Sequence, residues 1–144
     1  MDPILTLFDT YRAAVWDKDI ELFLSLYAED FRGFDLWGDW SLDGPKALRT
    51  MVQNWFGGLA EDRDRVTFSD IRITRGQDMA LAEAFVRFEA IAPDGTLLRG
   101  MDNRLTWGLR LGEAGWEIFH QHTSLPLGDD AAPQFGRPRD EAAQ

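Results

Sequence analysis

At 144 residues and 16.4 kDa the chain has the length of one domain, and its hydrophobic content of 44% is enough to fill one core. The formal net charge of −10 argues against nucleic acid and anionic membranes as partners, because both are bound through clustered lysine and arginine. The absence of cysteine excludes disulfides and thiolate nucleophiles. Since the first residues also lack a basic segment followed by an apolar run, we expect a cytoplasmic protein without a membrane span.

Three amphipathic helices are predicted in the first part of the chain. Asp2 is an N-cap before a first-turn proline, and apolar residues then recur at helical spacing. Asp19 caps a second, shorter helix that is expected to end near Glu29. A Gly-Pro pair at 44–45 opens the third helix, and a Gly-Gly pair at 57–58 stops it.

The rest of the chain is predicted to form an antiparallel sheet. A change in the alternation of apolar residues near Ser69 indicates a bulge. Because helices come first and strands follow, the expected class is α+β, with the helices packed on one face of the sheet. Residues 1–127 form this domain, and residues 128–144, which lack periodicity, are expected to be a flexible tail. The strand-like segments are 31–40, 66–74, 79–92, 96–111 and 116–127.

Both faces of the predicted strands carry apolar side chains. A period of two places His120 and His122 on one face of the last strand, and Gln121 and Thr123 on the other. A sheet covered by helices on one side only would leave its second apolar face in water, so this face is expected to be buried in a homodimer. The residues assigned to the dimer face are Ala84, Val86, Phe88, Trp116 and Ile118.

The sequence resembles a known superfamily over about residues 2–127. The resemblance lies in the helix pair, "LYAEDFRGFD" at 26–35, a Gly-initiated helix ending in Trp-Phe, and "GWEIFHQHTSLP" at 115–126. These features are similar to the SnoaL-like branch of the nuclear transport factor two-like superfamily. The resemblance implies a cone-shaped curved sheet wrapped by three N-terminal helices, usually in a dimer. Members include ketosteroid isomerase, polyketide cyclases and the association domain of calcium/calmodulin-dependent kinase, so the fold leaves the activity open.

The resemblance also implies candidate site residues. Similarity to ketosteroid isomerase places Tyr11 at the oxyanion-hole tyrosine and Asp35 at the general base, whereas the position of its third acid falls near Trp107. Similarity to the kinase association domain aligns the arginines of that domain's pocket with Arg87, Trp107 and Thr123. Only the first of these positions is an arginine in this chain. The two comparisons predict that a common set of side chains faces an internal cavity, while His120 and His122 face away from it. That set is Phe85, Arg87, Trp107, Gln121 and Thr123.

Each candidate has a structural alternative. The aromatic surroundings of Asp35 suit a general base, but the carboxylate could equally be the ion-pair partner of Arg87 or Arg49. Tyr11 could donate to an oxyanion or be a core residue, and Arg87 could bind an anionic ligand or pair with an internal carboxylate. Trp37 belongs to a group of tryptophans that could line a pocket for a flat hydrophobic molecule or simply fill the core.

Two functions remain open at this stage. The first is a cofactor-independent isomerase, cyclase or hydrolase that acts on a small hydrophobic or weakly anionic molecule. The second is a noncatalytic module for binding a small ligand or for dimerisation. No metal is expected, because His120 and His122 could share a zinc ion but the chain has no further histidine or cysteine to complete the site.

Overall fold

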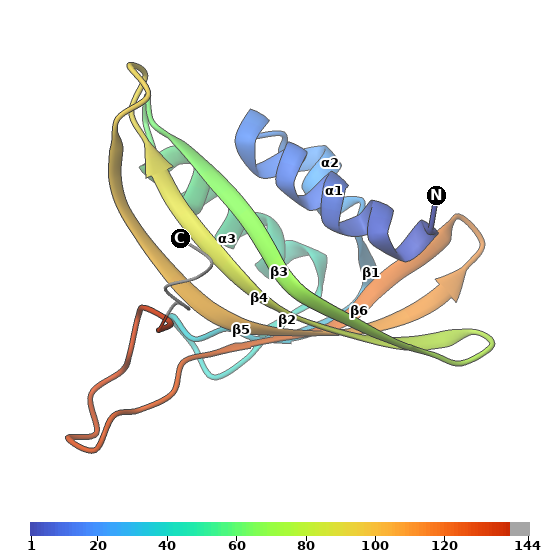
Figure 1. Cartoon of the computed structure of the whole chain (residues 1–144). Coiled ribbons are helices and arrows are strands. Elements are labelled where there is room, and N and C mark those ends of the chain that lie inside the picture. The colour runs from blue at the N-terminus through green and yellow to red at the C-terminus, as the bar shows by residue number, and fades with distance from the viewer. Residues whose placement is uncertain (139–144) are drawn as a thin grey trace.

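Three helices pack on one side of a curved sheet in the computed structural model, which describes residues 1–138 (Figure 1). They are α1 (Pro3–Asp17), α2 (Ile20–Leu24) and α3 (Gly44–Gly58). The two predicted caps are present, since the side chains of Asp2 and Asp19 accept hydrogen bonds from the backbone N–H groups of Ile4 and Leu22. Helix α2 is shorter than expected because strand β1 already begins at Tyr27. None of the described helices is long and apolar enough to cross a membrane.

The sheet has six strands in the order β2-β1-β6-β5-β4-β3. Strands β3 to β6 form the predicted antiparallel meander, whereas β1 runs parallel to β6, so the sheet is mixed and not wholly antiparallel. Parallel pairing is available to β1 because most of the chain lies between it and β6. The strands are β1 (Tyr27–Phe34), β2 (Leu42–Asp43), β3 (Arg63–Arg75), β4 (Met79–Ile91), β5 (Leu97–Gly112) and β6 (Gly115–Ser124).

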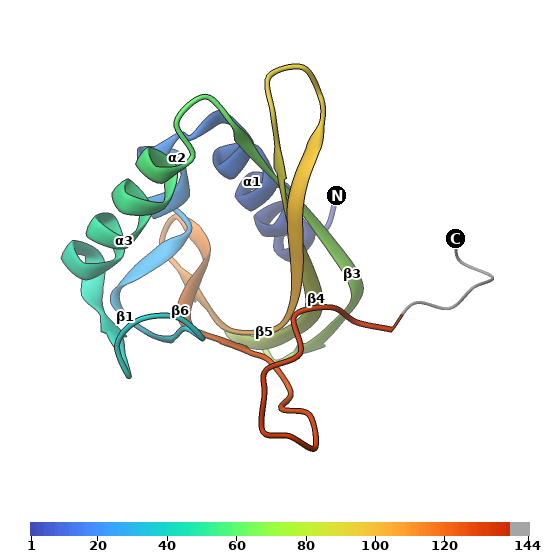
Figure 2. The ribbon, with the colours of Figure 1, turned by 90° about the vertical axis from the view of Figure 1, so that its left-hand side faces the viewer.

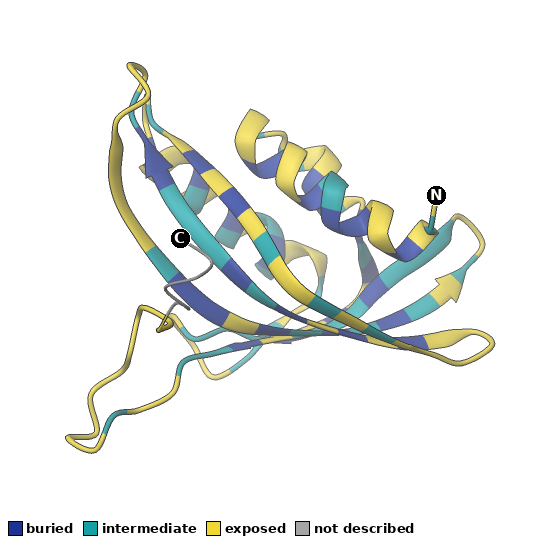
Figure 3. Ribbon diagram, viewed as in Figure 1, coloured by how far each residue is buried: buried dark blue, intermediate teal, exposed yellow. Residues whose placement is uncertain are grey.

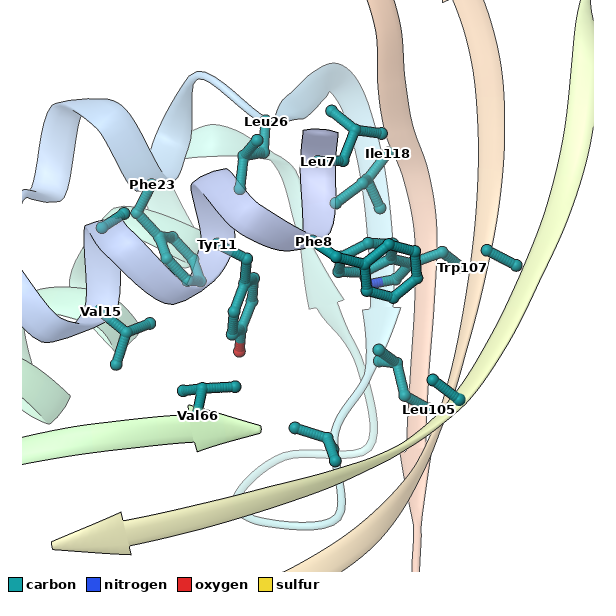
Figure 4. Packing of buried hydrophobic residues seen from close by; sticks show 14 of the residues in the cluster. Leu7, Phe8, Tyr11, Val15, Phe23, Leu26, Val66, Leu105, Trp107 and Ile118 are labelled. Carbon is teal, nitrogen blue, oxygen red and sulfur yellow. The ribbon is translucent and has the colours of Figure 1, made fainter. Parts of the chain in front are cut away.

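The core lies between the helices and the inner face of this sheet. Figure 2 shows the helices inside the hollow that the bent sheet forms, and Figure 3 shows the buried positions on the surfaces that face each other. The ring of Phe8 from α1 lies 4.4 Å from the fully buried Trp107 of β5, with Tyr11 beside them (Figure 4). The predicted α+β class, with helices covering one face, is therefore confirmed.

Two bulges change which side chains face the core. The bulge predicted near Ser69 is present, with Asp70 in the left-handed region at φ 51° and a register shift between Ser69 and Arg72. A second bulge was not predicted: Leu109 pairs with Ile118, but Gly108 pairs with His120, so Phe119 is the extra residue. Gly108 makes room for this bulge, because a Cβ there would lie 2.9 Å from the Phe119 ring.

The residues assigned to the dimer face belong to the core instead. Ile118 is fully buried, and Ala84 and Val86 are buried beneath the helices. Phe88 and Trp116 are partly buried and pack against the same cluster. The assignment was wrong because the bulge places Ile118 and Gln121 on the same, inner face. It also treated the small residues of β4 as the outer face, whereas they allow the helices to approach the sheet.

The segment that follows β6 makes defined contacts with the sheet. Within the segment Gln134 N donates to Pro126 O, and from the sheet Asp102 N donates to Phe135 O at 2.7 Å. Arg137 N donates to the Asp102 carboxylate at 2.9 Å, and its guanidinium lies 3.5 Å from the centre of the Phe85 ring. The part of the predicted flexible tail at 139–144 lies outside the described residues. Phe135 and Arg137 thus tie the end of this segment to Asp102 of β5 and Phe85 of β4.

Candidate functional site

A cavity of about 330 Å³ lies between the helices and the inner face of the sheet. The polar side chains that line it come from α1, the loop after β1, β3, β5 and β6. The apolar side chains come from the same loop and from α3, β4 and β5. The volume lies at the small end of the range for ligand sites. The polar lining residues are Tyr11, Asp35, Asp64, Asn103, Gln121 and Thr123, and the apolar ones are Trp37, Met51, Trp55, Phe88 and Met101.

The carboxylate of Asp35 is held in place by two donors. Thr123 Oγ1 donates to Oδ1 at 2.7 Å, and the backbone N of Trp37 donates to Oδ2 at 3.3 Å. Thr123 is fixed in turn, because its hydroxyl accepts from the backbone N of Leu36 at 3.2 Å. Thr123 and Trp37 thus line the cavity, and both of them also orient the carboxylate, while their contact with a ligand stays a prediction.

The structural alternative for Asp35, an ion pair with Arg87 or Arg49, is wrong. Arg49 pairs with Glu21, with Nη1 and Oε1 2.6 Å apart. Arg87 pairs with Asp102 and Glu89 on the opposite face of the sheet. Asp35 therefore lines the cavity without either of the basic partners that the alternative required.

Tyr11 presents its hydroxyl to the same cavity. Only 6% of the residue is exposed, and no described residue forms a hydrogen bond with the hydroxyl. Burial raises the pKa of Tyr11 well above its ordinary value, and the nearby charges of Asp35 and Asp64 raise it further. The phenol therefore keeps its proton and can donate it in a hydrogen bond to a ligand.

Gln121 also lines the cavity, and Trp107 orients it. The Gln121 Oε1 atom accepts from Tyr27 Oη at 2.7 Å and from Trp107 Nε1 at 2.9 Å. Because an indole N–H can only donate, the amide oxygen is fixed toward Trp107 and the amide nitrogen remains free to donate. Trp107 itself is fully buried and does not line the cavity, so its predicted role as a ligand contact is wrong.

Arg87 and Phe85 lie on the outer face, so the expectation that they line the cavity is also wrong. Arg87 Nη1 lies 3.3 Å from Asp102 Oδ2, and Nε lies 3.4 Å from Glu89 Oε2 in an ion pair without hydrogen-bond geometry. Its guanidinium crosses Gly100, where a Cβ would approach within 2.7 Å. The inner face of β4 is instead formed by Ala80, Ala82, Ala84, Val86 and Phe88.

Sequence reasoning missed two polar residues of the cavity. Asp64, at the start of β3, is 8% exposed and accepts from Trp55 Nε1 at 3.0 Å. Burial raises its pKa, while the Trp55 hydrogen bond and the charge of Arg99 act in the opposite direction. Asn103 is 6% exposed, and its Oδ1 has no hydrogen-bond partner in the described structure. Asn103 could have been found, because it alternates with Leu105 and Trp107 on one strand face, but Asp64 gave no such signal.

Two aromatic rings stand at the mouth of the cavity. Trp37 and Phe135 are stacked, with ring centroids 5.9 Å apart and planes at 16°. Beyond them lies an outer compartment of about 460 Å³, which shares Trp37, Trp55, Asp64, Phe88 and Met101 with the cavity and adds Arg99 and Phe135. The segment after β6 therefore supplies one wall of the entrance.

The two histidines face away from the cavity, as predicted. His120 and His122 pair with Gly108 and Thr106 on the outer face, and His120 Nδ1 lies 2.7 Å from the carbonyl oxygen of Arg32. Within residues 1–138, no group of three or more histidine, aspartate or glutamate side chains is placed to hold a metal ion. The absence of a metal stays a prediction.

Helices held in the hollow of a bent six-stranded sheet, with a cavity between them, define a nuclear transport factor two-like (NTF2-like) protein. The SnoaL-like domain family matches residues 4–128, and the chain belongs to that family. The resemblance inferred from the sequence is thereby confirmed.

Solved structures agree with this fold. An NTF2-like protein of unknown function from Pseudomonas putida KT2440 is 23% identical, with 94% of each chain covered and a TM-score of 0.81. An NTF2-like protein from Novosphingobium aromaticivorans is 21% identical, with 90% of this chain and 84% of the other covered and a TM-score of 0.76. No curated protein matches the sequence. At these identities the likeness establishes the fold alone.

Proposed function

We propose that the protein binds a small, largely apolar molecule in its cavity and acts on it by proton transfer without a cofactor. Asp35 accepts the proton, and Tyr11 donates a hydrogen bond to the oxygen on which negative charge develops. The reaction belongs to the isomerases, cyclases or hydrolases whose substrate carries a carbonyl or similar group. The proposal includes a cytoplasmic location and a homodimer.

The observation that carries this proposal is the meeting of Tyr11 and Asp35 in one cavity with apolar walls. The carboxylate of Asp35 is oriented by Thr123 and Trp37, so it needs no large rearrangement before it accepts a proton. The hydroxyl of Tyr11 has no partner among the described residues, so its hydrogen bond is available to the ligand. Donors of this kind stabilise charge strongly where walls of tryptophan and methionine exclude water.

Gln121 extends the donor set. Its Oε1 is occupied by Tyr27 and Trp107, which leaves the amide N–H groups for the ligand. An amide and a phenol that donate to one oxygen would resemble an oxyanion hole in their effect. Gln121 is therefore assigned to orient the polar group of the ligand.

A noncatalytic ligand-binding module is the second candidate. It is favoured by the hydrogen bonds that both oxygens of Asp35 already accept, because they give the carboxylate a structural role that needs no proton transfer. In this case the same cavity binds its ligand without turning it over.

Hydrogen–deuterium exchange on an enolisable ketone separates the two candidates. With 2-tetralone in D₂O, the wild-type protein should accelerate exchange of the protons next to the carbonyl, as followed by NMR. Asp35→Asn keeps the shape and removes the base, so the acceleration should fall by roughly 10²–10⁴-fold while the protein stays folded. Glu113→Gln, in the exposed turn after β5, makes the same charge change away from the cavity and should exchange like wild type.

Binding of 2-tetralone is measured alongside exchange. Saturable binding without accelerated exchange in the wild-type protein would contradict catalysis of this type and support the binding module. Acceleration that survives unchanged in Asp35→Asn would contradict the role of Asp35.

A further inference from the structure

The cavity carries negative charge with no positive side chain to balance it. Asp35 and Asp64 both line it, and no lysine, arginine or histidine does so among the described residues. The arginine that was expected there, Arg87, forms its ion pairs on the other face of the sheet. A buried carboxylate without a counter-charge is costly, so this lining favours a ligand that brings a positive charge.

A second, independent observation concerns Asn103. Its side chain is almost wholly buried, lines the cavity, and leaves Oδ1 without a hydrogen-bond partner in the described structure. Buried polar atoms are normally paired, and because Oδ1 is itself closed to solvent, a ligand atom can complete its hydrogen bond only after the Asn103 amide turns toward the cavity. The unpaired atom is an acceptor, so the missing partner is a donor.

The apolar walls suit a cation as well. Trp37, Trp55 and Phe88 line the cavity, and the faces of such rings attract positive charge. Trp55 also holds Asp64 in place through its indole N–H, so an aromatic ring and a carboxylate lie side by side. Recognition of ammonium groups commonly combines these two elements.

We infer that the cavity binds an apolar or aromatic molecule that carries a protonated amine, with Asp64 and Asn103 accepting its N–H groups. This inference rests on the proposed function, because it names the ligand class of the same cavity. It replaces the weakly anionic ligand expected from the sequence, since an anion would meet two acids and no base. A protonated amine supplies only donors, as the open acceptors of Asp64 and Asn103 require.

The surroundings of Asp64 agree with this assignment. Burial raises the pKa of its carboxyl, and the charge of Arg99 from the outer compartment only partly opposes that effect. Arg99 is exposed and forms no ion pair with Asp64 in the described structure, so the carboxylate keeps an unmet demand for positive charge. A bound ammonium group would meet it.

Three probes of similar size test the inference. They are 2-phenylethylamine as the cation, 2-phenylethanol as the neutral analogue and 3-phenylpropanoate as the anion, each titrated by calorimetry at pH 7. The amine should bind at least about tenfold more tightly than the alcohol, and the anion most weakly. Because the protein has a net charge of −10, the titrations are run at 0.15 M salt or above, where exposed charges are screened beyond about 8 Å.

Matched variants locate the effect. Asp64→Asn still accepts from Trp55 and should lower amine affinity about tenfold while leaving that of the alcohol within about twofold. Asn103→Leu, of similar volume but without the acceptor, should also weaken the amine selectively. Glu113→Gln removes one exposed negative charge and should change neither the amine affinity nor the alcohol affinity. That result would exclude attraction of the amine by the net charge of the protein.

The measurements distinguish a failure of the amine inference from a failure of the proposed function. If the alcohol binds in the cavity as tightly as the amine, the amine inference is overturned and the proposed function stands. If the amine preference persists in Asp64→Asn and Asn103→Leu, the cation is bound elsewhere and the inference is equally overturned. If neither the three probes nor 2-tetralone bind, the proposed function and the amine inference both fail.

Discussion

Among the described acidic residues, Asp64 is the one whose surroundings most clearly disfavour the ionised form of the side chain. Burial raises the pKa of its carboxyl above the ordinary value of 3.8, so the folded protein keeps this proton to a higher pH than the unfolded chain does. The contribution of this carboxyl to stability is therefore fully present below the unfolded pKa, and it is lost as the pH rises from there through the folded value. At neutral pH the charged carboxylate therefore lowers the free energy of unfolding.

This gives a prediction for Asp64→Asn that is independent of any ligand. The variant cannot ionise and should unfold at a higher urea concentration than wild type at pH 7, with the difference shrinking as the pH falls toward 3.8. Asp94→Asn is a control of opposite sign, because a hydrogen bond from Thr96 lowers the pKa of the exposed Asp94. A stability loss for Asp64→Asn at pH 7 would mean that Arg99 stabilises the charge more than burial penalises it.

Single residues also show what the sequence could predict about the site. Tyr11 and Asp35 were found because they lie in continuous stretches, a helix and the end of a strand, that resemble the family. Arg87 and Phe85 were assigned to the wrong face because the prediction followed the resemblance to the family and not the local pattern of β4. In that pattern Ala82, Ala84 and Val86 already indicate the inner face. Asp64 could not be found, since its burial depends on Trp55 of α3 packing over the start of β3.

At the scale of the elements, the bulge in β6 accounts for most of the remaining differences. A strict period of two placed Ile118 with His120 and opposite Gln121, but the extra residue Phe119 reverses the phase between them. All long strands and helices were nevertheless predicted, because their caps, turns and apolar periodicity are local. A bulge is decided by how neighbouring strands pair, and local pattern does not report that pairing.

The segment after β6 provides a prediction at this scale. Phe135 stacks on Trp37 at the cavity mouth, and its carbonyl is fixed by the backbone of Asp102. Phe135→Ala removes the ring and should weaken binding of 2-tetralone by about 2–10-fold, since an aromatic contact contributes about 0.5–1.5 kcal/mol. Leu98→Ala, at an exposed position near the β4–β5 turn, is the control and should bind like wild type. Equal affinities for Phe135→Ala and wild type would show that the segment does not form part of the ligand site.

For the whole molecule, the open question is what covers the outer face of the sheet. The helices fill the inner hollow, and the segment after β6 covers only the region around Asp102 and Phe85 (Figures 1 and 2). Strand β4 leaves Met79 and Leu81 exposed on this outer face, and β6 adds Phe119 beside the two histidines. The homodimer predicted from the sequence therefore remains our expectation, with this face in place of the core residues first assigned to it.

A dimer through the outer face should bury at least about 1,000 Å² in total and persist at micromolar concentration. Sedimentation equilibrium should give a species of twice the 16.4 kDa chain mass. Leu81→Glu places a charge in the middle of the proposed contact, beside the β5 residue Gly108, and should shift the protein to monomer while leaving the cavity intact. Leu97→Glu adds the same charge at the exposed β4–β5 turn and should stay dimeric.

A wild-type protein that sediments only as a monomer would contradict the dimer. A dimer that Leu81→Glu leaves intact would place the interface elsewhere, because a buried unpaired carboxylate costs too much to be tolerated there.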